Sequence, residues 1–224
     1  MQKQHTVLCI QDLSCVGRCS LAVVLPALAA MGVQPCALPT ALLSTHTGGL
    51  GRPARTDESG FISAALAHYA QLGLAFDCVY SGYLAGAAQV ALVEQAFRQA
   101  PAALKLVDPV MADGGAFYRG LGESTAQAMR TLAAHASVIT PNVTEAALLT
   151  RRAGLLQGPL SDESVRMLLD GLLALGAKAA VMTGCFLAQE GVHYVYGRSA
   201  QGPVFRIAYR QSSVRRFGTG DTFS

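Results

Sequence analysis

The last eight residues of the chain, 217–224, read FGTGDTFS and combine groups that could handle an anion. Gly218 and Gly220 flank Thr219, and glycines permit backbone angles at which successive N–H groups turn toward a small anion, especially where a helix begins directly afterwards. Asp221 would stand beside that anion, where an ionised carboxylate can take a proton from an attacking hydroxyl. The simpler interpretation is a strand-to-helix turn that Asp221 merely caps.

Polar side chains also follow the first three strands that the sequence pattern indicates. The loop beyond the carboxyl end of a strand in an open parallel sheet faces the ligand crevice, so these side chains are placed to meet a ligand. The second of these loops packs Ser, Thr, His and Thr before a glycine-rich stretch, which is typical of a flap over a polar ligand or of a solvated loop. The tyrosine after the third strand offers a flat apolar face and a phenol. The residues concerned are Asp12, Ser14, His46, Thr47 and Tyr83.

A second group of polar residues follows the fourth and fifth strands. Asp108 stands before a proline, where a carboxylate can hold a magnesium-bound water, and Asp113 can reach phosphates through the same ion. Alternatively, Asp108 only caps a turn. Asn142 and Glu145 are three residues apart at a helix start, so they can present an amide and a carboxylate on one face. The commoner meaning of that spacing is a capping box.

Strand-like and helix-like stretches alternate along the chain and would bring these residues together. The expected strands are 6–10, 34–38, 78–80, 104–107, 137–140 and 179–182, followed by an antiparallel hairpin of 192–196 and 204–209. The expected helices are 20–31, 57–72, 87–100, 123–135 and 161–175. Ser20 is either the cap of the first helix or a ligand contact. This order predicts an α/β fold, a doubly wound, mostly parallel sheet flanked by helices on both faces, with a short antiparallel edge.

Length and composition limit the class of protein. A chain of 224 residues suits one large domain, or a compact domain with a small appendage. The 51% of hydrophobic residues, without tryptophan, suit helices packed closely on a parallel sheet. The formal net charge of +3 argues against nucleic acid but allows a small anionic substrate. No apolar run is long enough to span a bilayer and no signal peptide is visible, so we expect no membrane partner and a cytoplasmic location. The six cysteines form no C-x-x-C pair, so reduced thiols are expected rather than a metal site.

Taken in order, several motifs resemble the pyridoxal kinase branch of the ribokinase-like superfamily. They are QDLS at 11–14, STHT at 44–47, SGYL at 81–84, DPVM at 108–111, TPNVTE at 140–145 and GTGD at 218–221. The last two are shared across the superfamily, whereas SGYL and the histidine-bearing loop point more narrowly to vitamin B6. The resemblance implies a single ribokinase-like domain over 1–224. Its implied activity is transfer of phosphate from ATP to the 5′-hydroxymethyl group of pyridoxal, pyridoxine or pyridoxamine.

The resemblance also implies that Asp221 deprotonates the substrate hydroxyl and that Gly218, Thr219 and Gly220 form the anion hole. Side chains around the pyridine ring would supply a carboxylate or hydroxyl for its substituents, an imidazole for its edge and a phenol beside its face. This substrate set is Asp12, Ser14, His46, Thr47 and Tyr83. Several pyridoxal kinases carry serine at the position of Asp12, and a carboxylate there could favour the amine, pyridoxamine.

On the nucleotide side, the resemblance implies that an amide and a carboxylate organise Mg²⁺ and the triphosphate of ATP. The nucleotide set is Asp113, Asn142, Glu145, Thr183, Gly184 and Thr219, and the metal set is Asp108 and Glu145. These roles suit phosphoryl transfer, which asks a protein mainly to position reactants and neutralise spreading charge. The family suggests a homodimer, and the sequence leaves open whether K⁺ is needed.

Two alternatives stand beside this interpretation. One is a hydroxymethylpyrimidine or hydroxymethylpyrimidine phosphate kinase, whose substrate is also a hydroxymethylated heteroaromatic ring. The other, from a different class, is a catalytically silent vitamer-binding protein. Relatives continue past the position of Ser224 into the helix behind the anion hole. We therefore expect the chain to be truncated at its carboxyl end, poorly active and marginally stable.

Overall fold

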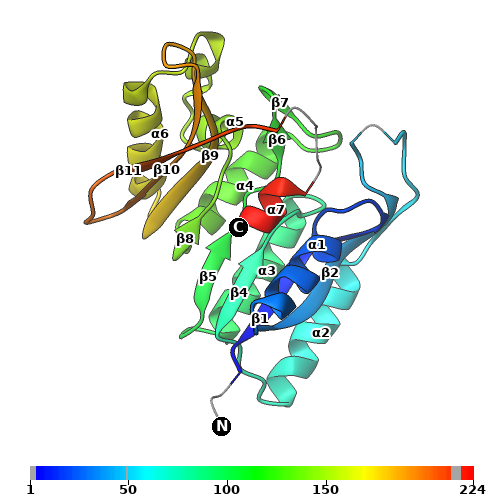
Figure 1. Cartoon of the computed structure of the whole chain (residues 1–224). Coiled ribbons are helices and arrows are strands. Elements are labelled where there is room, and N and C mark those ends of the chain that lie inside the picture. The colour runs from blue at the N-terminus through cyan, green and yellow to red at the C-terminus, as the bar shows by residue number, and fades with distance from the viewer. Residues whose placement is uncertain (1–3, 49, 213–217) are drawn as a thin grey trace. The chain divides into compact units, whose positions relative to one another are not determined.

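A computed structural model describes residues 4–48, 50–212 and 218–224 (Figure 1). The chain separates into two compact units, the first formed by residues 1–108 with 216–224 and the second by residues 109–215. The expectation of a single domain over 1–224 stays a prediction.

The first unit is built on a sheet in the order β3-β2-β1-β4-β5. β1 pairs in parallel with β2 and β4, β4 pairs in parallel with β5, and β3 is an antiparallel edge strand on β2. Its strands are β1 (Thr6–Val16), β2 (Gln34–Thr45), β3 (Arg55–Asp57), β4 (Cys78–Ser81) and β5 (Leu104–Val107). The parallel strands end at one edge of the sheet, which therefore gathers the residues that follow them.

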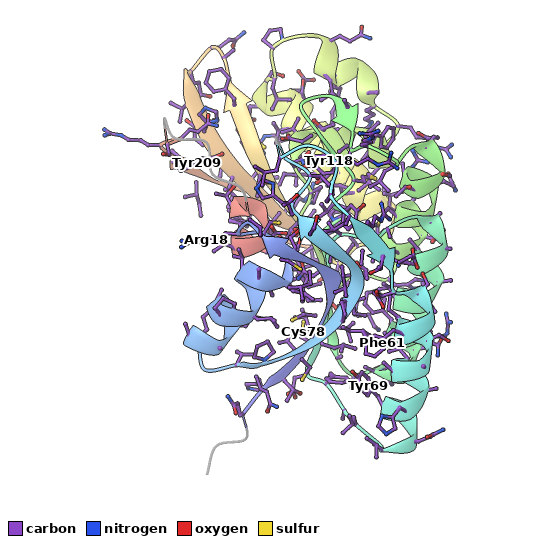
Figure 2. The ribbon with its side chains drawn as sticks, turned by 90° about the vertical axis from the view of Figure 1, so that its right-hand side faces the viewer. Arg18, Phe61, Tyr69, Cys78, Tyr118 and Tyr209 are labelled. Atoms are coloured by element: carbon purple, nitrogen blue, oxygen red, sulfur yellow. The ribbon has the colours of Figure 1, made fainter. Side chains whose placement is uncertain are left out.

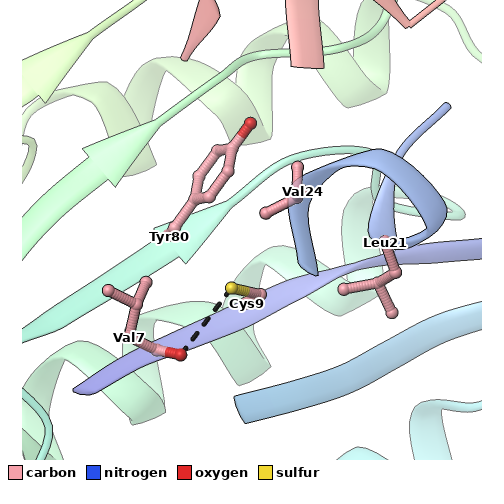
Figure 3. Close-up of a cluster of buried hydrophobic side chains, with 5 residues drawn as sticks. All are labelled: Val7, Cys9, Leu21, Val24 and Tyr80. Atoms are coloured by element: carbon pink, nitrogen blue, oxygen red, sulfur yellow. Dashed lines mark hydrogen bonds between the residues drawn. The ribbon is translucent and has the colours of Figure 1, made fainter. Parts of the chain in front are cut away.

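Helices cover both faces of this sheet. Figures 1 and 2 show α1 and the short α7 on one face and α2 and α3 on the other. The helices are α1 (Leu21–Ala30), α2 (Ser59–Gln71), α3 (Ala87–Gln99) and α7 (Thr219–Phe223). Under α1 lies a buried cluster formed by Val7, Cys9, Leu21, Val24 and Tyr80 (Figure 3). This unit has the doubly wound arrangement that the sequence predicts.

The second unit combines a parallel strand pair with an antiparallel hairpin. β8 (Val138–Ile139) pairs in parallel with β9 (Ala179–Leu187), and β10 (Val192–Ser199) pairs antiparallel with both β9 and β11 (Phe205–Tyr209). The hairpin confirms the predicted antiparallel edge. The other elements are β6 (Ala112–Asp113), β7 (Ala116–Phe117), α4 (Glu123–Ala133), α5 (Val143–Leu149), a 3₁₀ helix (Ala153–Gln157) and α6 (Asp162–Ala174).

β1 is longer than the sequence pattern predicts. The strand is expected to end at residue 10 and a loop to follow up to Ser20, but residues 11–16 belong to the strand. The strand continues to Val16 because its second half pairs with β2 past a bulge that follows Gln11. Asp12 and Ser14 therefore belong to a strand. The sequence pattern did not predict this extension, because it depends on pairing with another strand.

All six cysteines are unpaired, with Cys9 and Cys185 buried and Cys15 exposed. Within the described part of the chain, no helix combines the length and the apolar character that crossing a membrane requires.

Candidate active site

α7 begins at the glycine turn that the sequence singled out. Gly218 precedes the helix with a φ of 76°, in the left-handed region that favours glycine. Its Cα lies against the chain before α1, because a β-carbon there would be 2.1 Å from the carbonyl oxygen of Arg18. Figure 2 shows Arg18 beside α7. The turn is therefore fixed by a close backbone approach within the first unit.

Asp221 lies in the first turn of α7 and is held at the start of α1. Its Oδ2 accepts a hydrogen bond of 2.9 Å from the backbone N–H of Ser20, 201 residues away in the sequence. Burial raises the pKa of Asp221, the hydrogen bond from Ser20 lowers it, and the negative charge of Asp12 raises it; the net direction is upward. A carboxylate with a raised pKa is a stronger base than an exposed one, which suits proton abstraction.

Asp12 is buried beside the same helix start. Burial raises the pKa of its carboxyl, while the hydroxyls of Ser20 and Ser14 lower it. The Ser14 hydroxyl donates to Oδ2 of Asp12 over 3.0 Å. Asp12, Ser14 and Asp221 thus form one carboxylate-rich group, although the first two come from β1 and the last from α7.

Ser20 does not cap α1 in the way that its type suggests. It occupies the N-cap position, but its side chain makes no capping hydrogen bond, and its φ of 50° is unusual for a residue with a side chain. Its N–H donates a hydrogen bond to Asp221, and its hydroxyl lowers the pKa of Asp12. Such backbone strain is characteristic of functional sites. Here the strained residue interacts with the carboxylates of both Asp221 and Asp12.

Asp108 follows β5 and is also buried. Burial raises the pKa of its carboxyl, the negative charge of Asp221 raises it further, and the Ser224 hydroxyl lowers it. That hydroxyl donates to Oδ2 of Asp108 over 3.0 Å. Sequence reasoning gave Ser224 no role, because nothing local links it to a residue 116 positions earlier.

His46 lies directly after β2, whose end at Thr45 places the first half of the STHT motif in the strand. The N–H of Gly48 donates to Nδ1 of His46 over 3.0 Å. In the neutral imidazole the proton is therefore on Nε2, which can donate. The ring packs against Gly17, where a β-carbon would be 2.1 Å from Cδ2 of His46. Thr47, the next residue, is exposed.

Gly17→Ala is expected to displace the His46 ring, because Gly17 has a φ of 114° and no room for a β-carbon. If the imidazole contacts the substrate, the KM for the acceptor should rise by roughly tenfold while kcat changes less. Steady-state kinetics measure this. The matched control is Gly51→Ala, in the loop after His46, where the glycine also has a positive φ but a β-carbon would meet nothing within 4 Å. Equal KM values for the two variants would contradict a role for His46 in substrate binding.

Tyr83 follows β4 and is half-buried. Burial raises the pKa of its phenol, the Arg55 guanidinium lowers it and the Asp12 charge raises it. The Tyr83 carbonyl accepts a hydrogen bond of 2.8 Å from Thr40 Oγ1, which fixes the backbone at the strand end. Arg55, which sequence reasoning did not single out, donates to the carbonyl of Ala85 over 3.0 Å. The phenol, the carboxylate of Asp12 and this cation therefore act on one another electrostatically.

In the second unit, Asn142 and Glu145 form the capping box that their spacing allowed. Asn142 Oδ1 accepts from the N–H of Glu145, and Glu145 Oε2 accepts from the N–H of Asn142, each over 2.9 Å. Glu145 Oε1 also accepts from the N–H of Met111 over 3.0 Å, and Asn142 Nδ2 donates to the carbonyl of Ala112 over 2.8 Å. The pair therefore ties the start of α5 to the segment around β6.

The remaining nucleotide candidates lie around the same helix start. Asn142 and Thr183 are bridged in parallel, and Gly184 follows with a φ of 71°. Asp113 is exposed, and its Oδ1 accepts the N–H of Gly114 over 2.8 Å. Asp113, Asn142, Glu145, Thr183 and Gly184 all belong to the second unit, whereas the substrate set and Asp221 belong to the first.

The raised pKa of Asp12 has a consequence for stability. A carboxyl whose folded-state pKa lies above its unfolded value of about 3.8 binds more protons when folded, so its contribution to stability is lost as pH rises through the folded pKa. In ligand-free protein, Asp12→Asn should flatten the fall of Tm above about pH 4 and raise Tm at pH 8 by roughly 2–4 °C. Thermal melts across this range measure it. Asp170→Asn, at an exposed residue paired with Arg198, is the control. Parallel curves for wild type and Asp12→Asn would refute the effect.

The mostly parallel α/β fold and the matching family model are those of a phosphotransferase that acts on an alcohol group. The family model described as phosphomethylpyrimidine kinase matches residues 25–224. The chain therefore belongs to the phosphomethylpyrimidine kinase family. No curated protein matches the chain.

Several solved structures share the fold over nearly the whole chain. A Bacteroides thetaiotaomicron protein that carries the name of a phosphomethylpyrimidine kinase, in a crystal form with pyridoxal, is 31% identical with a TM-score of 0.89, over 99% of this chain and 78% of that one. Pyridoxal kinase from Lactobacillus plantarum is 36% identical with a TM-score of 0.87, over 98% and 77%. Pyridoxal kinase from Leishmania donovani, in complex with ADP and pyridoxamine, is 26% identical with a TM-score of 0.77, over 97% and 79%. These findings confirm the ribokinase-like fold class and the resemblance to pyridoxal kinases.

Proposed function

We propose that this phosphotransferase transfers phosphate from ATP to the 5′-hydroxymethyl group of a vitamin B6 vitamer. The observation that carries the proposal is the fixed carboxylate of Asp221, which the backbone N–H of Ser20 holds and whose pKa the charge of Asp12 raises. Similarity to a pyridoxal kinase and to a family member crystallised with pyridoxal supports the choice of substrate class.

In this proposal Asp221 accepts the proton of the substrate hydroxyl as the hydroxyl oxygen attacks the γ-phosphorus of ATP. The bond between the γ-phosphorus and the β,γ-bridging oxygen breaks, and ADP leaves. Burial, which raises the pKa of Asp221, strengthens it as a base. The N–H groups of Gly218, Thr219 and Gly220 would face the transferred phosphoryl group, whose charge spreads over its oxygens in the transition state. The protein mainly positions the hydroxyl and the phosphate, since effective alignment removes much of the barrier.

The substrate set is assigned by the chemistry of the pyridine ring. The Nε2–H of His46 would donate to a polar atom at the ring edge, and the flat face of Tyr83 would lie beside the ring. Asp12, with Ser14 and Thr47, would hold ring substituents. A carboxylate at position 12 attracts a cation, so pyridoxamine, whose amine is protonated at neutral pH, is the vitamer that it would favour.

Mg²⁺ is the ion that the family implies, and the residues present fit it. Asp108 is a buried carboxylate whose pKa is raised by burial and by the adjacent Asp221, so a divalent cation would offset its charge. No group of three or more His, Cys, Asp or Glu suited to a metal occurs among residues 4–48, 50–212 and 218–224, but Mg²⁺ usually takes only one or two carboxylates, with phosphates and water. When bound, it would neutralise charge developing on the phosphates.

The second unit supplies the proposed nucleotide residues. Glu145 already accepts backbone hydrogen bonds through both oxygens, so it would act on the metal through water while it fixes the start of α5. Asp113, Asn142, Thr183 and Gly184 would lie along the triphosphate. The homodimer, the dependence on K⁺ and the cytoplasmic location stay predictions.

A hydroxymethylpyrimidine or hydroxymethylpyrimidine phosphate kinase is the second candidate, favoured by the description of the matching family model. A substrate panel of pyridoxal, pyridoxine, pyridoxamine, hydroxymethylpyrimidine and its phosphate, each with Mg-ATP, separates the two. We expect kcat/KM for at least one vitamer to exceed that for either pyrimidine by roughly tenfold or more, which corresponds to a difference of about 1.4 kcal/mol in transition-state binding. A higher kcat/KM for either pyrimidine than for every vitamer would mean that the protein is a hydroxymethylpyrimidine or hydroxymethylpyrimidine phosphate kinase.

A further inference from the structure

Four side chains in the first unit have buried polar atoms without a hydrogen-bond partner among the described residues. The side chain of Gln11 is 0% exposed, and both its Nε2 and its Oε1 lack a partner; Tyr80 is 3% exposed, and its hydroxyl lacks one. The hydroxyls of Thr45 and Ser81 are in the same situation. Gln11 and Tyr80 differ from these because they share the face of the sheet that carries Asp108 and is covered by α1 and α7.

The strand register makes them diagonal neighbours on that face. Tyr80 of β4 is paired with Cys9 of β1, two residues before Gln11. The amide of Gln11 lies against Gly82, where a β-carbon would be 2.5 Å from Oε1. Successive residues of a strand point to opposite faces, so Cys9 and Gln11 point the same way as Tyr80 and the vacant β-position of Gly82.

Asp108 lies on the same face at the end of β5. Tyr80 is paired with Leu106, and Asp108 is two residues further along. Figure 3 shows the Tyr80 hydroxyl directed away from the Val7 and Leu21 side chains of the buried cluster. Burial, the negative charge of Asp108 and then that of Asp221 raise the pKa of Tyr80, and the Ser224 hydroxyl lowers it. A phenol hydroxyl can donate one hydrogen bond.

A buried amide and a buried phenol without hydrogen-bond partners destabilise the folded protein. A buried donor or acceptor without a partner loses its interaction with water and gains nothing in return, so native proteins leave few of them. Buried waters typically serve groups of this kind where several polar atoms converge. Proteins also keep destabilising side chains where activity depends on them.

We propose that the Gln11 amide and the Tyr80 hydroxyl are positioning groups of the phosphotransferase site: joined by bound water, they form a hydrogen-bond chain that ends on the carboxylates of Asp108 and Asp221. In this chain the amide N–H of Gln11 donates toward Tyr80 Oη, and the Tyr80 O–H donates toward the carboxylates. The two carboxylates are then oriented by Gln11 of β1 and Tyr80 of β4 as well as by Ser20 and Ser224. The proposal rests on the phosphotransferase activity and is independent of which ring is the acceptor.

Two variants that keep size and remove polarity test the proposal. Tyr80→Phe should lower kcat by roughly tenfold or more, because it removes a hydrogen bond to a charged group, while KM for the acceptor and for ATP changes by less than about threefold. Gln11→Met should lower kcat by roughly fivefold with the same small change in KM. Both are measured with whichever acceptor the wild-type protein turns over. The double variant should lose little more than Tyr80→Phe alone, since the two groups act in one chain.

A stability comparison separates this role from a structural one. Gln11→Met should leave Tm unchanged or raise it, because it removes an unpartnered buried amide. The matched control is Gln89→Met, since Gln89 is equally buried but bonded to the carbonyl of Thr40, the N–H of Ala85 and the hydroxyl of Ser59. That control should lower Tm. A fall of Tm for Gln11→Met as large as for Gln89→Met would show a structural partner and overturn the proposal.

A third readout needs no turnover. The side-chain NH₂ resonances of Gln11, assigned by their loss in Gln11→Met, should shift in Tyr80→Phe if the chain is continuous, and they should not shift in Tyr69→Phe, which lies on α2 (Figure 2). Unchanged Gln11 resonances in Tyr80→Phe, kcat retained within about twofold in both single variants, or additive effects in the double variant would each overturn the proposal.

Discussion

Replacing Asp221 with asparagine is expected to lower kcat by roughly 10²- to 10⁴-fold with little change in the dissociation constants of either substrate. Asparagine keeps the size of the side chain, and its amide oxygen can still accept the N–H of Ser20, which now binds Oδ2 of Asp221 over 2.9 Å. What disappears is the ability to accept a proton from the hydroxyl. The loss should therefore fall on the chemical step and leave the fold and the binding surfaces in place.

Single-turnover kinetics and equilibrium titration of ATP and acceptor measure these two quantities separately. Asp170→Asn is the matched control, because it makes the same change at an exposed ion pair and should leave kcat within about twofold. If Asp221→Asn turned over at a similar rate to this control, another group would be the base. The roles proposed for the anion hole would then lose their basis as well.

The second large effect is expected for Gly218→Ala, which should lower kcat by roughly 10²-fold. Two costs combine at this position. The φ of 76° is strained for any residue with a β-carbon, and that carbon would lie 2.1 Å from the carbonyl oxygen of Arg18. Because the obstacle is backbone, the strain is relieved only when α7 moves away from the segment before α1. Such a shift breaks the contact between Ser20 and Asp221 and misplaces the base.

Gly73→Ala separates the two costs. Gly73 also has a positive φ, of 62°, but a β-carbon there would meet nothing within 4 Å. This control should lose about 1 kcal/mol of stability from backbone strain and keep kcat. Thermal melts and steady-state kinetics on both variants measure the difference. Equal kcat values for Gly218→Ala and Gly73→Ala would mean that α7 tolerates displacement, contrary to the proposed site.

Local patterns were enough to predict much of the fold. β5 begins and ends where its apolar run does, and α1, α3 and α6 lie within two residues of their expected bounds, because apolar spacing and stop signals act over a few neighbours. The capping box of Asn142 and Glu145 was recognisable for the same reason. The short strands β3, β6 and β7 were missed, since a run of two or three residues carries no period.

The sequence by itself determined the alternation of strands and helices, the doubly wound class and the motifs that place this chain with the phosphomethylpyrimidine and pyridoxal kinases. These features follow from side-chain types and spacing, which are local. Only the tertiary structure decided that β1 runs on past Gln11, that the backbone of Ser20 holds Asp221, that Ser224 reaches Asp108, and that the amide of Gln11 is buried without a partner. Each of these depends on contacts between segments far apart in the chain, where pairing and burial, rather than propensity, set the geometry.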